Sequence, residues 1–172
     1  MAWDVARFTR FLKSVDALPA LSETLLPYEG HDEVVIDELW TFVARKKDNF
    51  WVWLALSRRN LQVIAFFVGG RDLKSAQILW EQVPVAWKEC LVFTDAYPVY
   101  ERLLAKRPLQ HCVGTKSGGY TSVVEGANNA LRQGVSYLGR KASAFARSPF
   151  WLTTRLHWFL HHWNQRQAKK FL

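Results

Sequence analysis

Three stretches rich in Val, Ile, Trp and Phe follow one another between residues 33 and 70, and they constrain the fold more than any other feature. They read EVVIDELW, FWVWLALS and LQVIAFFVGG, and short basic turns join them. Runs of this composition predict β-strands. Because so short a link cannot carry a parallel crossover, consecutive strands must pair as antiparallel neighbours. The sequence therefore predicts a three-stranded antiparallel meander.

After the meander, helical and strand patterns alternate. We expect a helix over 71–83, a strand over 90–95, a helix over 96–105, a strand over 109–114 and helices over 122–138 and 148–170. This order predicts an α/β fold with a mixed five-stranded sheet flanked by helices, which is the order of the RNase H-like fold. We expect residues 1–30 to form a helical lead-in and residues 31–172 to form the main domain.

Positive charge is concentrated in the C-terminal half. The chain of 172 residues has a formal net charge of +8, and residues 101–172 hold 12 Lys and Arg but only 2 Asp and Glu. Such a half favours a polyanionic partner, most often nucleic acid, over a merely soluble basic surface. Two cysteines without metal-ligand spacing favour a reducing, cytosolic compartment. The longest apolar run, 63–68, is too short to span a membrane, so no membrane partner is expected.

Three carboxylates are candidates for chemistry. Asp37 lies inside an apolar strand, Asp95 ends another strand just before a helix, and Glu125 is the only acidic residue after position 101. Each has an ordinary alternative, namely an ion pair or exposed strand face, a helix cap and a solvated helix face. Together they suit a two-metal phosphoryl-transfer site, because carboxylate oxygens are hard ligands that hold Mg²⁺.

The segments around these carboxylates resemble the DDE transposases of the insertion-sequence-1 family. The resemblance runs from IDELWTFVARKK through CLVFTDAYPVY to VVEGANNALRQGVSYLGRK, and it continues into LHWFLHHWNQR. It implies that Asp37, Asp95 and Glu125 are the catalytic metal ligands, with two Mg²⁺ or Mn²⁺ ions. It also implies that water cleaves a DNA strand and that the transposon 3′-OH then attacks target DNA.

The resemblance implies DNA as the partner, both at the transposon ends and at the target. The residues expected to contact DNA are Lys116, Asn129, Arg132, Arg140, Lys141 and Arg147. A homodimer or higher multimer is expected, together with an upstream zinc-finger and helix-turn-helix partner region. The expected location is the prokaryotic cytoplasm, in association with the nucleoid.

Three positions around Glu125 depart from the family pattern. Val123, Gly126 and Ala127 stand where the family usually has a His, an Arg and an aromatic residue. Altered surroundings of a metal ligand predict activity lowered by roughly 10- to 100-fold. Two alternatives follow: a transposase-derived DNA-binding or regulatory protein that is weakened or inactive in catalysis, and an RNase H-like nuclease.

Overall fold

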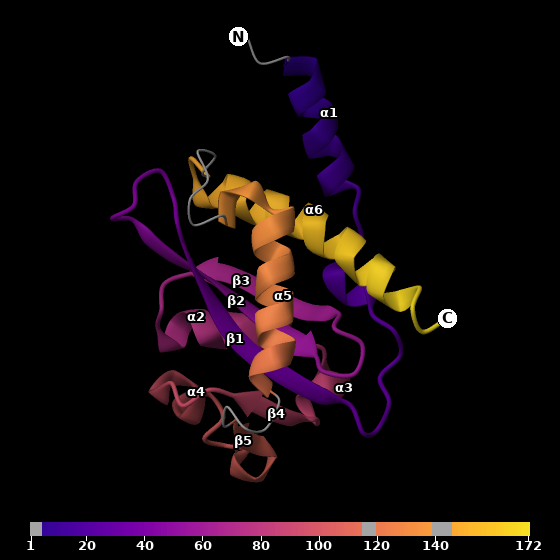
Figure 1. Cartoon of the computed structure of the whole chain (residues 1–172), viewed down its shortest axis with the longest axis vertical. Coiled ribbons are helices and arrows are strands. Elements are labelled where there is room, and N and C mark those ends of the chain that lie inside the picture. The colour runs from indigo at the N-terminus through magenta and orange to yellow at the C-terminus, as the bar shows by residue number, and fades with distance from the viewer. Residues whose placement is uncertain (1–4, 115–119, 139–145) are drawn as a thin grey trace.

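The computed structural model describes residues 5–114, 120–138 and 146–172, and in these ranges the chain forms a five-stranded mixed sheet (Figure 1). The strands are β1 (Glu33–Phe42), β2 (Asn49–Ser57), β3 (Val63–Gly69), β4 (Leu91–Thr94) and β5 (His111–Val113). Their order in the sheet is β3-β2-β1-β4-β5. The first three pair antiparallel, whereas β4 pairs parallel to β1 and β5 parallel to β4. The predicted meander and mixed sheet are confirmed.

Helices cover both faces of this sheet. The described helices are α1 (Val5–Asp16), α2 (Leu73–Gln82), α3 (Val85–Lys88), α4 (Pro98–Leu103), α5 (Tyr120–Gly134) and α6 (Pro149–Ala168), with 3₁₀ turns η1 (Leu21–Thr24), η2 (Pro108–Gln110) and η4 (Ser136–Leu138). Helix α1 packs on α6 and points away from the sheet. One face packs against α5 and α6 in a core that includes Leu54 and Leu131. The other packs against α2, α3 and α4 around Trp53 and Leu79. In Figure 1, α5 lies across the strands on the near side and α2 behind them.

Strand β1 is the middle strand, and its alternating side chains enter both cores. Leu39 belongs to the core under α5 and α6, whereas Ile36 belongs to the core under α2 and α4. Successive side chains of a strand point to opposite faces. Asp37 therefore shares the face of Leu39, and Glu38 shares the face of Ile36. The adjacent carboxylates of Asp37 and Glu38 therefore lie on opposite faces of the sheet.

Helix α5 ends earlier than the sequence predicted, and its last residue lies close against α6. The apolar stripe indicated a helix over 122–138, but α5 stops at Gly134 and η4 follows. A Cβ built at Gly134 would lie 2.0 Å from a ring carbon of Phe159 on α6. Only glycine permits so close an approach of the two helices. The short α3 and the turn η1 were not predicted either. None of the described helices combines the length and apolar character that a membrane crossing needs.

The outer edge of β3 is closed at its start by a side chain from α6. Asn164 is fully buried, and its Oδ1 accepts from the Val63 backbone N–H at 2.7 Å. Its Nδ2 donates to the Val63 carbonyl and to Thr24 Oγ1, both at 2.8 Å. One side-chain amide thus does for Val63 what a neighbouring strand would do, which satisfies backbone groups that burial would otherwise penalise.

Replacing this amide should destabilise the protein markedly. Asn164→Ala leaves the N–H and C=O of Val63 without partners in a buried place, and each such group costs about 1–3 kcal/mol. We expect the free energy of unfolding to fall by about 2–4 kcal/mol. Urea denaturation followed by far-ultraviolet circular dichroism measures the change.

The matched control is Gln133→Ala, which removes an exposed side-chain amide from α5. Its unfolding free energy should change by no more than about 0.5 kcal/mol. An equal loss in both variants would contradict the role given to Asn164 at the sheet edge.

Candidate active site

Asp37 lies on the face of β1 that α5 crosses, and a side chain of α5 holds it. Asn128 Nδ2 donates to Asp37 Oδ2 at 2.7 Å. Helix α5 reaches this position because its apolar stripe, which includes Ala127 and Leu131, packs in the core beneath it. This hydrogen bond ties α5 to β1 at the predicted carboxylate, Asp37.

Asp95 lies one residue beyond the end of β4, and the strand register places it level with Asp37. Strand β4 pairs parallel to β1 with Phe93 opposite Val35. Two residues further along each strand come Asp95 and Asp37, on the same side by the period-two rule. Asp95 is exposed, and its Oδ1 accepts from the Tyr97 backbone N–H at 2.9 Å in a turn before α4. The N-cap of α4 is Tyr97, so Asp95 lies two residues before the helix and binds the N–H of the cap residue itself.

The surroundings of Asp37 oppose its negative charge. Burial raises the pKa of the Asp37 carboxyl to about 6, and the nearby carboxylates of Glu38 and Asp95 push it in the same direction. The hydrogen bond from Asn128 acts against this rise. The half-buried carboxylate of Asp37 is repelled by the exposed carboxylate of Asp95. A cation between them would remove this repulsion and part of the desolvation cost of Asp37.

The amide of Asn128 has one polar atom that the described residues leave unsatisfied. Its Oδ1 is buried without a hydrogen-bond partner among them. The carboxylate of Asp37 requires the NH₂ group on its own side, so the oxygen is the atom left over. Buried polar atoms are nearly always paired, and an exception calls for an explanation. An amide oxygen next to a carboxylate is a ligand type that Mg²⁺ accepts.

The third predicted carboxylate, Glu125, lies on α5 like Asn128, but it is not grouped with Asp37 and Asp95. It is exposed on α5, three residues before Asn128, and therefore on a neighbouring part of the helix surface. Within the described ranges, no three His, Cys, Asp or Glu side chains are grouped closely enough to hold a metal ion. The structure thus joins Asp37 to Asn128 by a hydrogen bond and sets Asp95 close enough for its charge to act on Asp37, whereas Glu125 is not grouped with them.

The predicted DNA contacts divide into described and undescribed residues. Asn129 and Arg147 are exposed, whereas Arg132 is half-buried and donates from Nη1 to the Leu138 carbonyl at 2.8 Å. Lys116, Arg140 and Lys141 lie outside the described residues.

Sequence reasoning missed two features of this site. Asn128 was not assigned a role there, although it follows Glu125 by one helical turn, which is the spacing that puts two side chains on one face. Glu38 was not singled out, and no partner was expected for it. In the structure its carboxylate accepts hydrogen bonds from Arg71 and Tyr100. No local sequence pattern predicts these two partners, because they lie 33 and 62 residues away from Glu38 in the chain.

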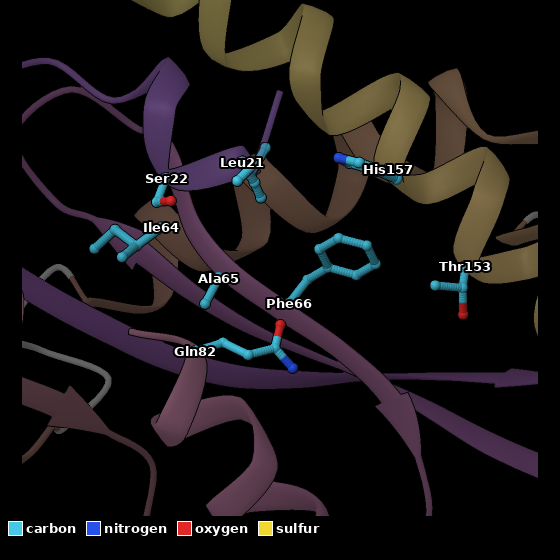
Figure 2. Close-up of a pocket in the computed structure, with 9 residues that line it drawn as sticks. Leu21, Ser22, Ile64, Ala65, Phe66, Gln82, Thr153 and His157 are labelled. Carbon is cyan, nitrogen blue, oxygen red and sulfur yellow. The ribbon is translucent and has the colours of Figure 1, made fainter. Parts of the chain in front are cut away.

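A cavity of about 390 Å³ lies elsewhere, between η1, β3, the end of α2 and α6 (Figure 2). Its described lining is largely apolar, with Phe66 and Leu21 facing His157 and Gln82 across it. None of its nine lining residues is an Asp, Glu or Cys. The cavity therefore lacks the carboxylate oxygens that Asp37 and Asp95 offer to a metal ion.

Comparison with known proteins points to one family. A family model described as IS1 transposase matches residues 33–167. The Insertion element IS1 protein InsB of Shigella flexneri is 31% identical over 113 residues, which cover 66% of this chain and 82% of that protein. The Insertion element IS1 2 protein InsB of Escherichia coli (strain K12) is 30% identical over 126 residues, covering 69% of this chain and 70% of that protein.

Removing the charge of Asp37 should stabilise the protein in the absence of metal. A carboxyl whose pKa rises on folding binds more protons in the folded state, so stability falls as pH rises from about 4 to about 6. Asp37→Asn removes this penalty. We expect a gain in unfolding free energy of about 3 kcal/mol at pH 7 that largely disappears near pH 4. Denaturant titrations across this pH range measure it.

The control is Asp48→Asn, an exposed position in the turn between β1 and β2. It should show no gain that grows with pH. A stability loss in Asp37→Asn at pH 7 would mean that the ionised carboxylate is compensated by its neighbours, and the electrostatic account of the site would be wrong.

Proposed function

The chain belongs to the IS1 transposase family, and from that premise we propose that it is a DDE-type transposase that cuts and joins DNA strands at the ends of an insertion sequence. The catalytic domain would be RNase H-like and span residues 31–172, with residues 1–30 as a helical lead-in. The observation that carries the proposal is the register of β1 and β4, which sets Asp37 level with Asp95.

The residues at the site suit divalent metal ions. Asp37 and Asp95 offer two adjacent carboxylates, and Asn128 offers an amide oxygen that is buried without a partner among the described residues. All three are hard oxygen ligands of the kind that Mg²⁺ and Mn²⁺ prefer. Two bound ions would supply Lewis-acid stabilisation of the attacking and leaving oxygens of a phosphodiester. Glu125 would join on binding, from its exposed position on α5.

The chemistry consists of two displacements at phosphorus. In the first, water attacks a phosphodiester at the transposon end, the P–O3′ bond breaks, and the products are a 3′-OH and a 5′-phosphate. In the second, that 3′-OH attacks a target phosphodiester and displaces its O3′, so one P–O bond forms as another breaks. Asp37 and Asp95 would hold the divalent ions against which the reacting phosphate is oriented, while Asn128 would keep the Asp37 carboxylate turned toward that site.

The basic C-terminal half would hold the DNA. Arg147 and Asn129 are exposed and available for phosphate contacts, while Arg132 also supports the end of α5 through Leu138. Lys116, Arg140 and Lys141 would add charge to the same half. Contacts of this kind position the duplex without reading its sequence. Two ends must be processed together, so the working form would be a dimer or higher multimer, with an upstream DNA-recognition region as its partner.

The exposed position of Glu125 favours one second candidate, a transposase-derived protein that binds DNA without cutting it. In that reading the carboxylate pair stays without a third ligand, and Gly126 and Val123 mark a site that has lost its catalytic surroundings. The two functions differ in whether DNA cleavage depends on metal and on the carboxylates.

Strand cleavage should require both carboxylates. The test incubates the full chain with Mg²⁺ or Mn²⁺ and a plasmid carrying the DNA that flanks its gene on both sides, and measures nicks by gel electrophoresis. Asp37→Asn and Asp95→Asn should each lower the cutting rate by at least about 100-fold, because altering mere supports of metal ligands already costs 10- to 100-fold. Asp48→Asn should cut like the wild type.

DNA binding without metal-dependent nicking would select the non-catalytic function. Preferential cutting of an RNA–DNA hybrid would select the nuclease alternative.

Metal affinity should distinguish the parts played by Asn128 and Glu125. Asn128→Leu removes the free amide oxygen and the support of Asp37, so Mn²⁺ binding measured by calorimetry should weaken by roughly 10- to 100-fold. Glu125→Gln should weaken it as well if that side chain joins the site. Gln133→Leu on the exposed side of α5 is the control. Unchanged affinity in Glu125→Gln would remove Glu125 from the ligand set.

A further inference from the structure

Glu38 is a buried carboxylate that the proposed chemistry does not use. Its side chain is 2% exposed. Oε1 accepts from Arg71 Nε at 2.9 Å and from Arg71 Nη2 at 2.6 Å, while Oε2 accepts from the Tyr100 hydroxyl. A buried charge persists only where it is paired and fully hydrogen-bonded, and both oxygens of Glu38 meet that condition.

Arg71 is held from several sides at once. Its guanidinium carbon lies 4.4 Å from the ring centre of Trp51 and 4.3 Å from that of Tyr97. Its carbonyl accepts from the Tyr97 hydroxyl at 2.9 Å, and the carbonyl of the preceding Gly70 accepts from Trp53 Nε1 at 2.8 Å. Arg71 therefore contacts β1 through Glu38, β2 through Trp51, and the start of α4 through Tyr97.

Tyr97 connects this arrangement to Asp95. Its backbone N–H donates to Asp95 Oδ1 at 2.9 Å, and its ring meets that of Tyr100 edge-on at 6.0 Å. Asp95 itself follows the last paired residue of β4 and is exposed, so strand hydrogen bonds do not fix it. The Asp95 carbonyl accepts from Thr94 Oγ1 at 2.9 Å, whereas its carboxylate is held by the Tyr97 N–H. Arg71 holds the far end of the turn from Asp95 to Tyr97.

We propose that Arg71 is a positioning residue, which fixes the Asp95–Tyr97 turn against β1 through Tyr97 and Glu38 and so keeps the carboxylate of Asp95 level with that of Asp37. The inference rests on the proposed function for its consequence, because the position of Asp95 matters only if that carboxylate binds metal. Arginine suits the task because its planar group stacks on aromatic rings while its N–H groups bind a carboxylate.

A second role for Arg71 makes the opposite prediction about metal affinity. If Arg71 only offset the negative charge of the carboxylates, removing it would leave the site more negative, and a divalent cation would bind more tightly. If Arg71 positions Asp95, its removal loosens a ligand and weakens binding, as loss of a support of metal ligands does by roughly 10- to 100-fold. The direction of the change therefore decides between the two.

The experiment compares Arg71→Met and Arg71→Lys in the full chain by two measurements. Mn²⁺ affinity from calorimetry should fall by roughly 10- to 100-fold in both, because lysine keeps the charge but loses the planar stack. Hydrogen exchange at the Tyr97 amide should become faster in both without metal, while amides in the centre of β2 keep their protection. Arg107→Met is the matched control, since it removes an arginine paired with Glu89.

Tyr97→Phe provides a second route if Arg71→Met does not fold. It keeps the ring but removes the hydroxyl that donates to the Arg71 carbonyl, so both readouts should shift in the same direction by a smaller factor. Tighter Mn²⁺ binding in Arg71→Met, wild-type affinity in Arg71→Lys, or unchanged exchange at the Tyr97 amide would each overturn the inference. If the wild type binds no Mn²⁺, the proposed metal chemistry fails, and the Tyr97 amide still decides whether Arg71 holds the turn.

Discussion

The parallel pairing of β4 with β1 is the constraint on which the rest of the site depends. The three antiparallel strands could form a meander by themselves, and Asp37 would then be one polar group in a buried strand. Strand β4 pairs parallel to β1 with Phe93 opposite Val35, and this brings the carboxyl end of β4 to the level of Asp37. Carboxyl ends of neighbouring parallel strands are where open α/β sheets collect functional groups. Burial is the main cause of the raised pKa of Asp37, and the pairing adds the smaller repulsion from Asp95.

Once the two strands are level, the two layers of helices have different tasks. Helix α5 approaches from the face of Asp37 and supplies Asn128, whereas α4 lies on the other face and supplies Tyr100 to Glu38. Adjacent residues of one strand thus bind to opposite layers. A shift of β1 by one residue would exchange Asp37 and Glu38 and break both sets of contacts, so the register of the central strand is specified from both sides.

The sequence predicted the sheet well because its information is local. The strands of the meander are dense in β-branched and aromatic residues, their links are short, and such links allow only one pairing. The α5–α6 contact could not be predicted in this way. The need for glycine at position 134 comes from Phe159, which lies on another helix, so no pattern within α5 could predict it. The same holds for Arg71 and Glu38, whose attraction appears only after β1 and the end of β3 are placed together.

The carboxylates show the limit of this reasoning. Asp37 and Asp95 stood out in the sequence because acids are costly in apolar strands and common at strand ends, and the parallel register brings them level. Glu125 stood out because it is isolated in a basic half, but isolation says nothing about direction. On α5, Glu125 faces solvent while Asn128, one turn later, contacts Asp37. Helix contacts are set by the buried stripe of Ala127 and Leu131, so the residue that reaches the sheet is the one beside that stripe. The hydrogen bond from Asn128 to Asp37 is the contact that this packing already holds. If Glu125 is a metal ligand, its side chain must come closer to Asp37 and Asp95 than it lies in this structure.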